Sequence, residues 1–119
     1  MPNGINEYTP LVDRTCPRHS SRMTRPAKLD DAHVQKWLAS HPGWERSGDG
    51  AIARAYKLDD FNAALGFVVR VGLAAEKRDH HPDIELGWGR ARVLWSTHDA
   101  GGITELDLAL AEACDAFAG

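Results

Sequence analysis

The amino-acid sequence predicts an α+β domain in which a four-stranded antiparallel sheet carries helices packed on one face. Two observations lead to this fold class. Short segments with strand-like alternation come in pairs, and turn-forming residues, such as the Ser-Gly-Asp-Gly run at 47–50, join the members of a pair. Segments with apolar residues at helical spacing lie before, between and after these pairs. The predicted element order is therefore α-β-β-α-β-β-α, and hairpins joined by helices build an antiparallel sheet.

The first half of the patterned region predicts one helix and one hairpin. The helix is expected to begin near Asp30, a good N-cap residue, and to end at Pro42 and Gly43. Its apolar face consists of Val34, Trp37 and Leu38. The two strands of the hairpin are expected over about 44–47 and 51–58.

The second half predicts a long helix, another hairpin and a last helix. The long helix is expected over about 60–77, and the two strands over about 84–88 and 91–97. The predicted apolar face of the long helix consists of Phe61, Leu65, Val68, Gly72 and Ala75. A loop follows at 99–102. The last helix opens at Thr104, and Asp107 three residues later completes a capping box with Asp in place of the usual Glu.

The composition bounds the class of protein. The chain has 119 residues, of which 26% are charged and 43% hydrophobic, as in a single soluble globular domain. A net charge of −3 argues against a nucleic-acid or membrane surface as partner, and no apolar run approaches the roughly 18 residues of a membrane span. Cys16 and Cys114 form no CxxC motif, so we expect a cytoplasmic protein. Residues 1–24 lack a sustained period and are expected to form a flexible extension, which leaves one domain over 25–119.

The candidate chemistry lies in a run of acids and histidines, EKRDHHPD at 76–83, and in a further histidine, His98, at the end of the last predicted strand. Glu76 and His80 are four residues apart, so they share one helix face if the helix reaches that far. The carboxylate would then hold the imidazole in position. Because imidazoles exchange protons near neutral pH, these histidines are candidates for general acid–base catalysis.

Two other interpretations stay open on spacing alone. Adjacent histidines at a helix end are often solvated side chains or partners of the last carbonyl groups. Three histidines with nearby aspartates are also a candidate zinc set, although no HxH, HExxH or CxxC spacing is present. His19, His33 and His41 show no comparable setting and receive no role. The sequence contains neither a glycine-rich phosphate loop after a strand nor a GxSxG motif.

Four longer stretches extend the pattern around these residues: GW at 43–44, YKLDDFNAALGFVVRVGLAAEK at 56–77, AEKRDHHPD at 75–83 and STHDAGGITELDLALA at 96–111. Together they resemble the pterin-4a-carbinolamine dehydratase family over nearly all of 28–118. The specific part is the combination of E-x-x-D-H-H-P, T-H-D-x-G-G and T-x-x-D. One departure is Ile84, which stands where many members carry an aromatic residue, and the extension has no family counterpart.

The resemblance implies an enzyme that removes water from a 4a-hydroxytetrahydropterin to give a quinonoid dihydropterin, with no metal or organic cofactor. That reaction recycles the tetrahydrobiopterin left by aromatic amino-acid hydroxylases. The resemblance also implies assembly into homodimers or homotetramers. Because some members stabilise the dimer of a transcription factor, the alternative is a non-enzymatic partner-binding module on the same fold.

By position, the resemblance gives the catalytic role to His80, His81 and His98. The positions that it assigns to substrate binding are Glu76, Asp79, Pro82, Ser96, Thr97, Asp99, Trp44 and Asp107. For Asp107 the alternative is a helix cap alone, and for Trp44 it is a residue of the core. The division of proton transfer among the three histidines stays open.

Overall fold

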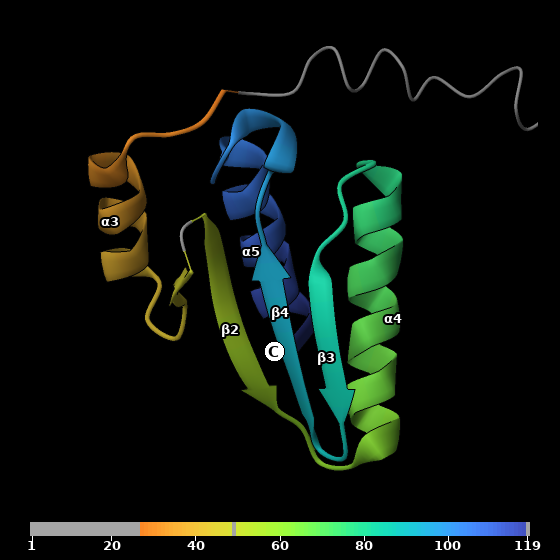
Figure 1. The fold of residues 1–119 in the computed structure, drawn as a ribbon. Coiled ribbons are helices and arrows are strands. Elements are labelled where there is room, and N and C mark those ends of the chain that lie inside the picture. The colour runs from red at the N-terminus through yellow and green to blue at the C-terminus, as the bar shows by residue number, and fades with distance from the viewer. Residues whose placement is uncertain (1–26, 49, 119) are drawn as a thin grey trace, which may run out of the picture.

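The computed structural model describes residues 27–48 and 50–118 (Figure 1). Its sheet contains β1 (Glu45–Ser47), β2 (Ala51–Lys57), β3 (Asp83–Gly87) and β4 (Arg90–Trp95). The spatial order is β1-β2-β4-β3, and every neighbouring pair is antiparallel. The predicted sheet is therefore confirmed. The predicted extension lies outside the described residues.

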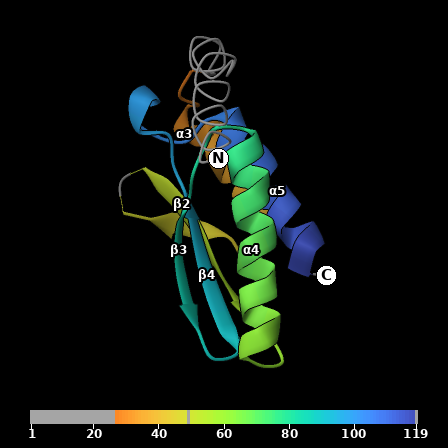
Figure 2. The ribbon, with the colours of Figure 1, turned by 90° about the vertical axis from the view of Figure 1, so that its right-hand side faces the viewer.

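The helices are α3 (Asp31–Ser40), α4 (Phe61–Lys77) and α5 (Glu105–Ala118), and a short 3₁₀ turn, η1 (His98–Ala100), lies where a loop was predicted. Figure 2 shows α4 and α5 on the same side of the strands, and among the described residues no helix covers the other, open face of the sheet. The predicted α+β order is confirmed, with η1 added before the last helix. Among the described residues, no helix has both the length and the apolar character required to cross a membrane.

Side-chain caps explain where the helices begin. Asp30 Oδ1 accepts a hydrogen bond from His33 N at 2.8 Å, and Asp60 Oδ1 accepts one from Ala63 N at 2.8 Å. At α5, Asp107 Oδ2 accepts from the backbone N–H of Thr104 at 2.9 Å. This is the contact that the capping box predicts.

The core lies between the sheet and the helices. Its members include Val34, Trp37, Trp44, Ile52, Tyr56, Phe67, Val71, Val93 and Trp95. The buried face of α4, however, differs from the predicted one and consists of Ala64, Phe67, Val71 and Ala75. Of the predicted face only Ala75 is fully buried, whereas Phe61 and Leu65 are exposed. Because α4 is apolar on several sides, spacing alone does not select the face that packs on the sheet.

Candidate active site

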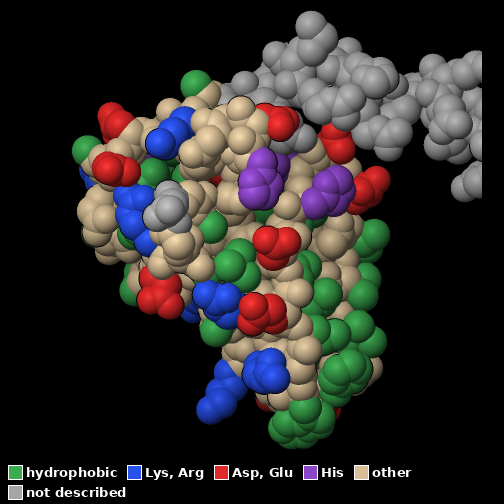
Figure 3. All heavy atoms as spheres, in the orientation of Figure 1, with side chains coloured by type: hydrophobic (Ala, Val, Ile, Leu, Met, Phe, Trp, Pro, Cys, Tyr) green, Lys and Arg blue, Asp and Glu red, His purple; other side chains and the backbone are tan. Residues whose placement is uncertain are grey.

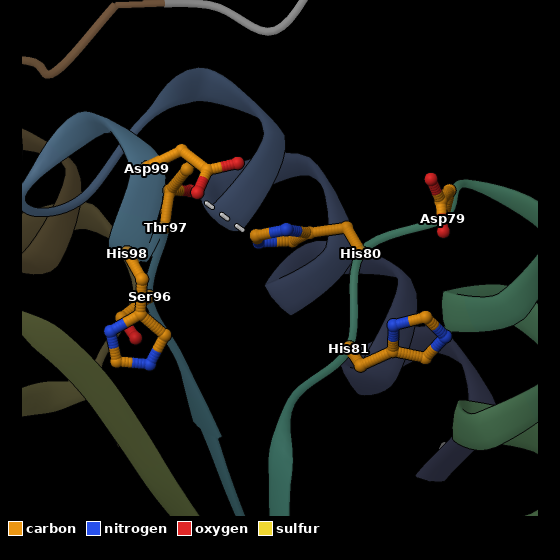
Figure 4. A pocket seen from close by; sticks show the side chains of 7 residues that line it. All are labelled: Asp79, His80, His81, Ser96, Thr97, His98 and Asp99. Atoms are coloured by element: carbon orange, nitrogen blue, oxygen red, sulfur yellow. Dashed lines mark hydrogen bonds between the residues drawn. The ribbon is translucent and has the colours of Figure 1, made fainter. Parts of the chain in front are cut away.

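The C-terminus of α4 places two of the histidines. Asp79 has a φ of 52° and so lies in the left-handed region. The backbone N–H of Asp79 donates to Glu76 O at 3.1 Å, and that of His80 donates to Ala75 O at 3.1 Å. These two bonds form a Schellman motif, in which glycine usually occupies the left-handed position. The motif turns the chain sharply, so that His80 and His81 leave the helix in different directions (Figure 4).

His80 points inward and is held by a buried carboxylate. It is 5% exposed, and its Nε2 donates to Asp107 Oδ1 at 2.5 Å. The other oxygen of that carboxylate accepts from Thr97 Oγ1 at 2.7 Å as well as from Thr104 N. Trp95 lies parallel to the imidazole, with 5.8 Å between the ring centroids and 17° between the planes. Because Asp107 accepts at Nε2, the tautomer and the position of His80 are both fixed.

Asp107 therefore has a different place from the one expected of a substrate-binding residue. It is completely buried and lies behind His80, and the pocket lining does not include it. One oxygen orients the imidazole, and the other caps α5 and receives the hydroxyl of Thr97. A buried carboxylate is tolerated when each oxygen accepts hydrogen bonds.

His81 points toward α4 and is exposed. Its Nε2 donates to Glu76 Oε1 at 2.7 Å, and the two side chains are 57% and 67% exposed. The expected pairing of Glu76 with His80 is therefore wrong. The reason is the left-handed residue Asp79, which ends the helix before His80 and sends that side chain to the interior instead of along the helix face.

The opposite wall comes from the end of β4 and from η1. The residues that line the pocket are Asp79, His80, His81, Ser96, Thr97, His98 and Asp99, and its volume is about 230 Å³ (Figure 4). His98 lies across the pocket from His81, with His80 between them (Figure 4). In Figure 3, two histidine side chains lie close together near the top of the open face of the sheet. The structure thus gathers the three histidines, which belong to two separate segments, around one pocket.

Besides Glu76 and Asp107, two further residues that were expected at the site do not line the pocket. Trp44 is buried in the core, where its Nε1 donates to the carboxylate of Asp115 at 3.1 and 3.2 Å. Its indole packs edge-on against Tyr56. Pro82 is partly buried beside the histidines but does not line the pocket.

Trp95, whose ring lies against His80, was not predicted as a site residue, because periodicity marks it only as an inward-facing strand residue.

The lining of the pocket suits proton transfer and the recognition of polar heterocycles. All seven lining residues carry polar side chains, including three imidazoles, two hydroxyls and two carboxylates. Within 27–48 and 50–118, no three His, Cys, Asp or Glu side chains form a set that could hold a metal ion. The imidazoles can donate or accept protons, and the carboxylates and hydroxyls can pair with ring N–H groups and carbonyls.

The comparisons with known proteins agree with this geometry. Residues 27–117 match the family described as pterin 4 alpha carbinolamine dehydratase. A relative from Thermomicrobium roseum, provisionally named pterin-4-alpha-carbinolamine dehydratase, is 51% identical over 71% of this chain and 90% of its own length. A relative from Chloroflexus aggregans with the same provisional name is 43% identical over 78% of this chain and 99% of its own length.

Solved structures show the same fold. A transcriptional coactivator/pterin dehydratase from Brucella melitensis superimposes with a TM-score of 0.74 at 38% identity, covering 77% of this chain and 99% of that one. A pterin dehydratase-like protein identified as a RuBisCO assembly factor in the alpha-carboxysome gives a TM-score of 0.57 at 21% identity, covering 66% of this chain and 93% of that one. The second likeness concerns the fold alone.

Proposed function

The chain belongs to the pterin 4 alpha carbinolamine dehydratase family, and from this premise we propose that its pocket removes water from a 4a-hydroxytetrahydropterin to give a quinonoid dihydropterin. The observation that carries the proposal is the meeting of His80, His81 and His98 around one polar pocket. The proposed setting is the recycling of tetrahydrobiopterin in the cytoplasm, and the proposed reaction uses side chains alone.

The chemistry explains why imidazoles suit this reaction. The bond between C4a and the hydroxyl oxygen breaks, and the oxygen leaves as water after it receives a proton. The N5–H bond gives up its proton, and its electron pair forms the N5–C4a double bond. No electrons are gained or lost overall. A positioned acid and a positioned base each lower the barrier of such an elimination, together by on the order of 10²–10⁴ in rate.

The geometry supports a division of roles. His80 is buried, oriented by Asp107 and set at the back of the pocket, and His98 lies on the opposite wall from His81. We assign His80 and His98 to proton transfer at the hydroxyl. His81, which is held at the rim by Glu76, orients the pterin ring or takes the N5 proton.

The remaining lining residues suit the binding of the pterin ring. A pterin presents N–H donors and a carbonyl acceptor along the edge of its pyrimidine ring. The carboxylates of Asp79 and Asp99 can accept from such donors, and the hydroxyl of Ser96 can donate to such an acceptor. The substrate-binding role proposed for these residues rests on their place in the pocket and on their hydrogen-bonding chemistry.

The decisive experiment follows the formation of quinonoid dihydropterin from freshly prepared 4a-carbinolamine, with and without the full-length protein. His80→Ala and His98→Ala are each expected to lower kcat by about 10²-fold or more. His33→Ala is the matched control, because His33 is an exposed histidine on α3 outside the pocket. Unchanged turnover in both pocket variants would overturn the assignment.

A second observation supports self-association. Four apolar residues form an exposed row along α4, which we call the outer row: Phe61, Leu65, Val69 and Leu73, with exposures of 45%, 42%, 49% and 67%. In Figure 3, hydrophobic side chains gather along this side of the molecule. Large exposed apolar patches mark protein interaction sites. We propose that a second copy covers the outer row in a homodimer or homotetramer.

The same surface is available to the alternative function, a partner-binding module without enzymatic activity. One of the similar structures is called both a transcriptional coactivator and a pterin dehydratase, and this name is the reason to test the partner-binding function. The turnover experiment separates the two. A partner-binding module leaves the decay of the carbinolamine unchanged, whereas a dehydratase accelerates it.

A further inference from the structure

Trp95 lies directly behind the pocket, at the end of β4. Its side chain faces the core, as do those of Val93 and Thr97, and it is fully buried. Its indole lies nearly parallel to the imidazole of His80, at 17° and a centroid distance of 5.8 Å. The pocket lining does not include it. Of the three histidines that line the pocket, Trp95 stacks on His80.

Two hydrogen-bonding groups meet the His80 imidazole at one atom. Asp107 Oδ1 and Thr97 Oγ1 both approach Nε2, at 2.5 and 3.5 Å. The indole of Trp95 contacts the imidazole in a different way, through the face of the ring. A flat aromatic surface against the imidazole favours one ring plane, because stacked rings prefer a parallel, offset arrangement.

The continuation of β4 supplies both kinds of contact. Trp95 and Thr97 are successive inward-facing residues, so both reach the same side of the sheet. Thr97 is held by a bridge to Gly102, in which Thr97 N donates to Gly102 O at 2.9 Å. One extended segment thus holds the face of the imidazole through Trp95 and the carboxylate at Nε2 through Thr97.

A tryptophan at this position costs free energy of folding, so stability alone does not explain why this residue is a tryptophan. Among the described residues, Trp95 Nε1 is buried without an oxygen or nitrogen partner. Its N–H interacts with the thiol of Cys114 and lowers the pKa of that thiol, but sulfur is a weak acceptor. Burying a poorly paired donor costs free energy that phenylalanine would avoid. Compared with a phenylalanine ring, the indole presents a broader flat face to the imidazole.

From these observations we propose that Trp95 is a positioning residue that sets the plane of the His80 imidazole in the pocket. The structural part of the inference stands on the stacking geometry. Its kinetic consequence rests on the proposed dehydratase function. The molecule also contains a second pair of this kind, in which Trp37 stacks on His41 at 4.0 Å and 14°, outside the pocket.

The test compares three full-length variants with the wild-type protein. Trp95→Phe keeps a flat ring, Trp95→Leu keeps apolar volume without one, and Trp37→Leu removes the other Trp–His pair as a control. The first measurement is the NMR signal of the His80 ring C–H groups, assigned with His80→Gln. Stacking on the indole displaces these signals upfield, and Trp95→Leu is expected to abolish that displacement while Trp37→Leu leaves it intact.

The second measurement is steady-state dehydration. We expect Trp95→Leu to lower kcat by about 10-fold with KM within about 2-fold, because the acid–base group is misaligned while the rest of the pocket is intact. Trp95→Phe is expected to restore most of kcat, and Trp37→Leu to change neither parameter. If Trp95→Leu does not fold, Trp95→Met, which also lacks a flat face, replaces it in both measurements.

The outcomes are distinguishable. A folded Trp95→Leu protein with unchanged His80 signals, or with unchanged kcat in an active enzyme, overturns the inference. An equal loss of kcat in Trp95→Leu and Trp37→Leu also overturns it, because the effect would then be general destabilisation. If the wild-type protein lacks dehydratase activity but the His80 signals move as expected, the positioning role stands and the proposed function fails.

Discussion

Asp79 occupies a backbone position that glycine fills in most Schellman motifs. A side chain at positive φ costs roughly 1 kcal/mol relative to glycine, and Asp79, at a φ of 52°, also lines the pocket. We therefore expect Asp79→Gly to raise the free energy of unfolding by about 1 kcal/mol and to lower kcat/KM. Chemical unfolding followed by circular dichroism measures the first effect, and the carbinolamine assay measures the second.

The matched variant for this position is Asp79→Asn. Asparagine tolerates the left-handed conformation, so its stability is expected to resemble that of the wild type. Its uncharged amide removes the carboxylate from the pocket, so kcat/KM should fall as it does in Asp79→Gly. If Asp79→Gly keeps full kcat/KM, the carboxylate has no part in substrate binding and the residue is retained for another reason.

Cys114 shows how burial alone alters the chemistry of a residue. Burial raises the pKa of its thiol from 9.0 to about 11, an effect that the nearby indole N–H of Trp95 only partly offsets. Between these two pH values the unfolded thiol is ionised and the folded thiol is neutral, so the unfolded state binds fewer protons. The free energy of unfolding should therefore fall as the pH rises from 9 to 11, by on the order of 1–3 kcal/mol.

The measurement is a series of unfolding curves between pH 8 and 11. Burial and the neighbouring Asp115 also raise the pKa of Tyr56, so that residue contributes in the same direction and at higher pH. Cys114→Ala is expected to flatten the slope between pH 9 and 10, and Tyr56→Phe to leave this part of the slope in place, because Tyr56 contributes only from about pH 10 upward. A slope that Cys114→Ala does not change would show that the thiol titrates normally.

At the scale of elements, a single side chain in the first turn of α5 has two functions. Asp107 caps the helix through Thr104 N and orients His80 through its other oxygen. Asp107→Asn keeps the shape but presents an amide, which cannot accept every hydrogen bond that the carboxylate accepts. We expect a loss of roughly 1–3 kcal/mol in the free energy of unfolding and a fall in kcat of at least about 10-fold.

Glu112→Gln is the control for this change. It removes another carboxylate from α5, but Glu112 is exposed and contacts Trp37 and His41 away from the pocket. Its kcat should equal that of the wild type. If Asp107→Asn loses stability but keeps kcat, then Asp107 serves only as the helix cap, which is the alternative that the sequence itself left open.

The elements also show which features can be predicted from sequence. The hairpins, the helix caps and the capping box depend on residues within a few positions of one another, so local patterns predict them. The buried face of α4 does not follow from local pattern, because Phe67 is selected over Phe61 only by its contact with Tyr56 on the sheet. The partner of Glu76 was missed because a left-handed aspartate cannot be inferred from spacing. The place of Trp44 depends on Asp115, 71 residues away.

At the scale of the whole molecule, the pairing of β3 with β4 builds the site. Asp83 pairs with Leu94, so the chain just before β3 and the chain just after β4 run side by side at one edge of the sheet. The first carries His80 and His81, and the second carries His98. No periodicity predicted that these segments meet. The expectation came from the resemblance to a family, whose motif combined both segments.

In the part of the chain that the structure describes, the outer row of α4 is also exposed, and this leads to the last prediction. Leu73 is 67% exposed, so Leu73→Glu removes no contact from the core of a single chain. If a second copy covers the outer row, a buried charge in that interface disfavours assembly. Light scattering after gel filtration should show an oligomer for the wild type and a monomer for Leu73→Glu. Gln35→Glu, which adds the same charge on exposed α3, should leave the mass unchanged.

The kinetics of the monomeric variant then decide how assembly relates to catalysis. All seven residues that line the described pocket belong to one chain, and none of them lies in the outer row. A folded Leu73→Glu monomer is therefore expected to keep kcat and KM within about 2-fold of the wild-type values. A wild-type protein that is monomeric at micromolar concentration would refute self-association through α4. A monomeric variant that folds but has lost activity would show instead that the pocket requires the neighbouring subunit.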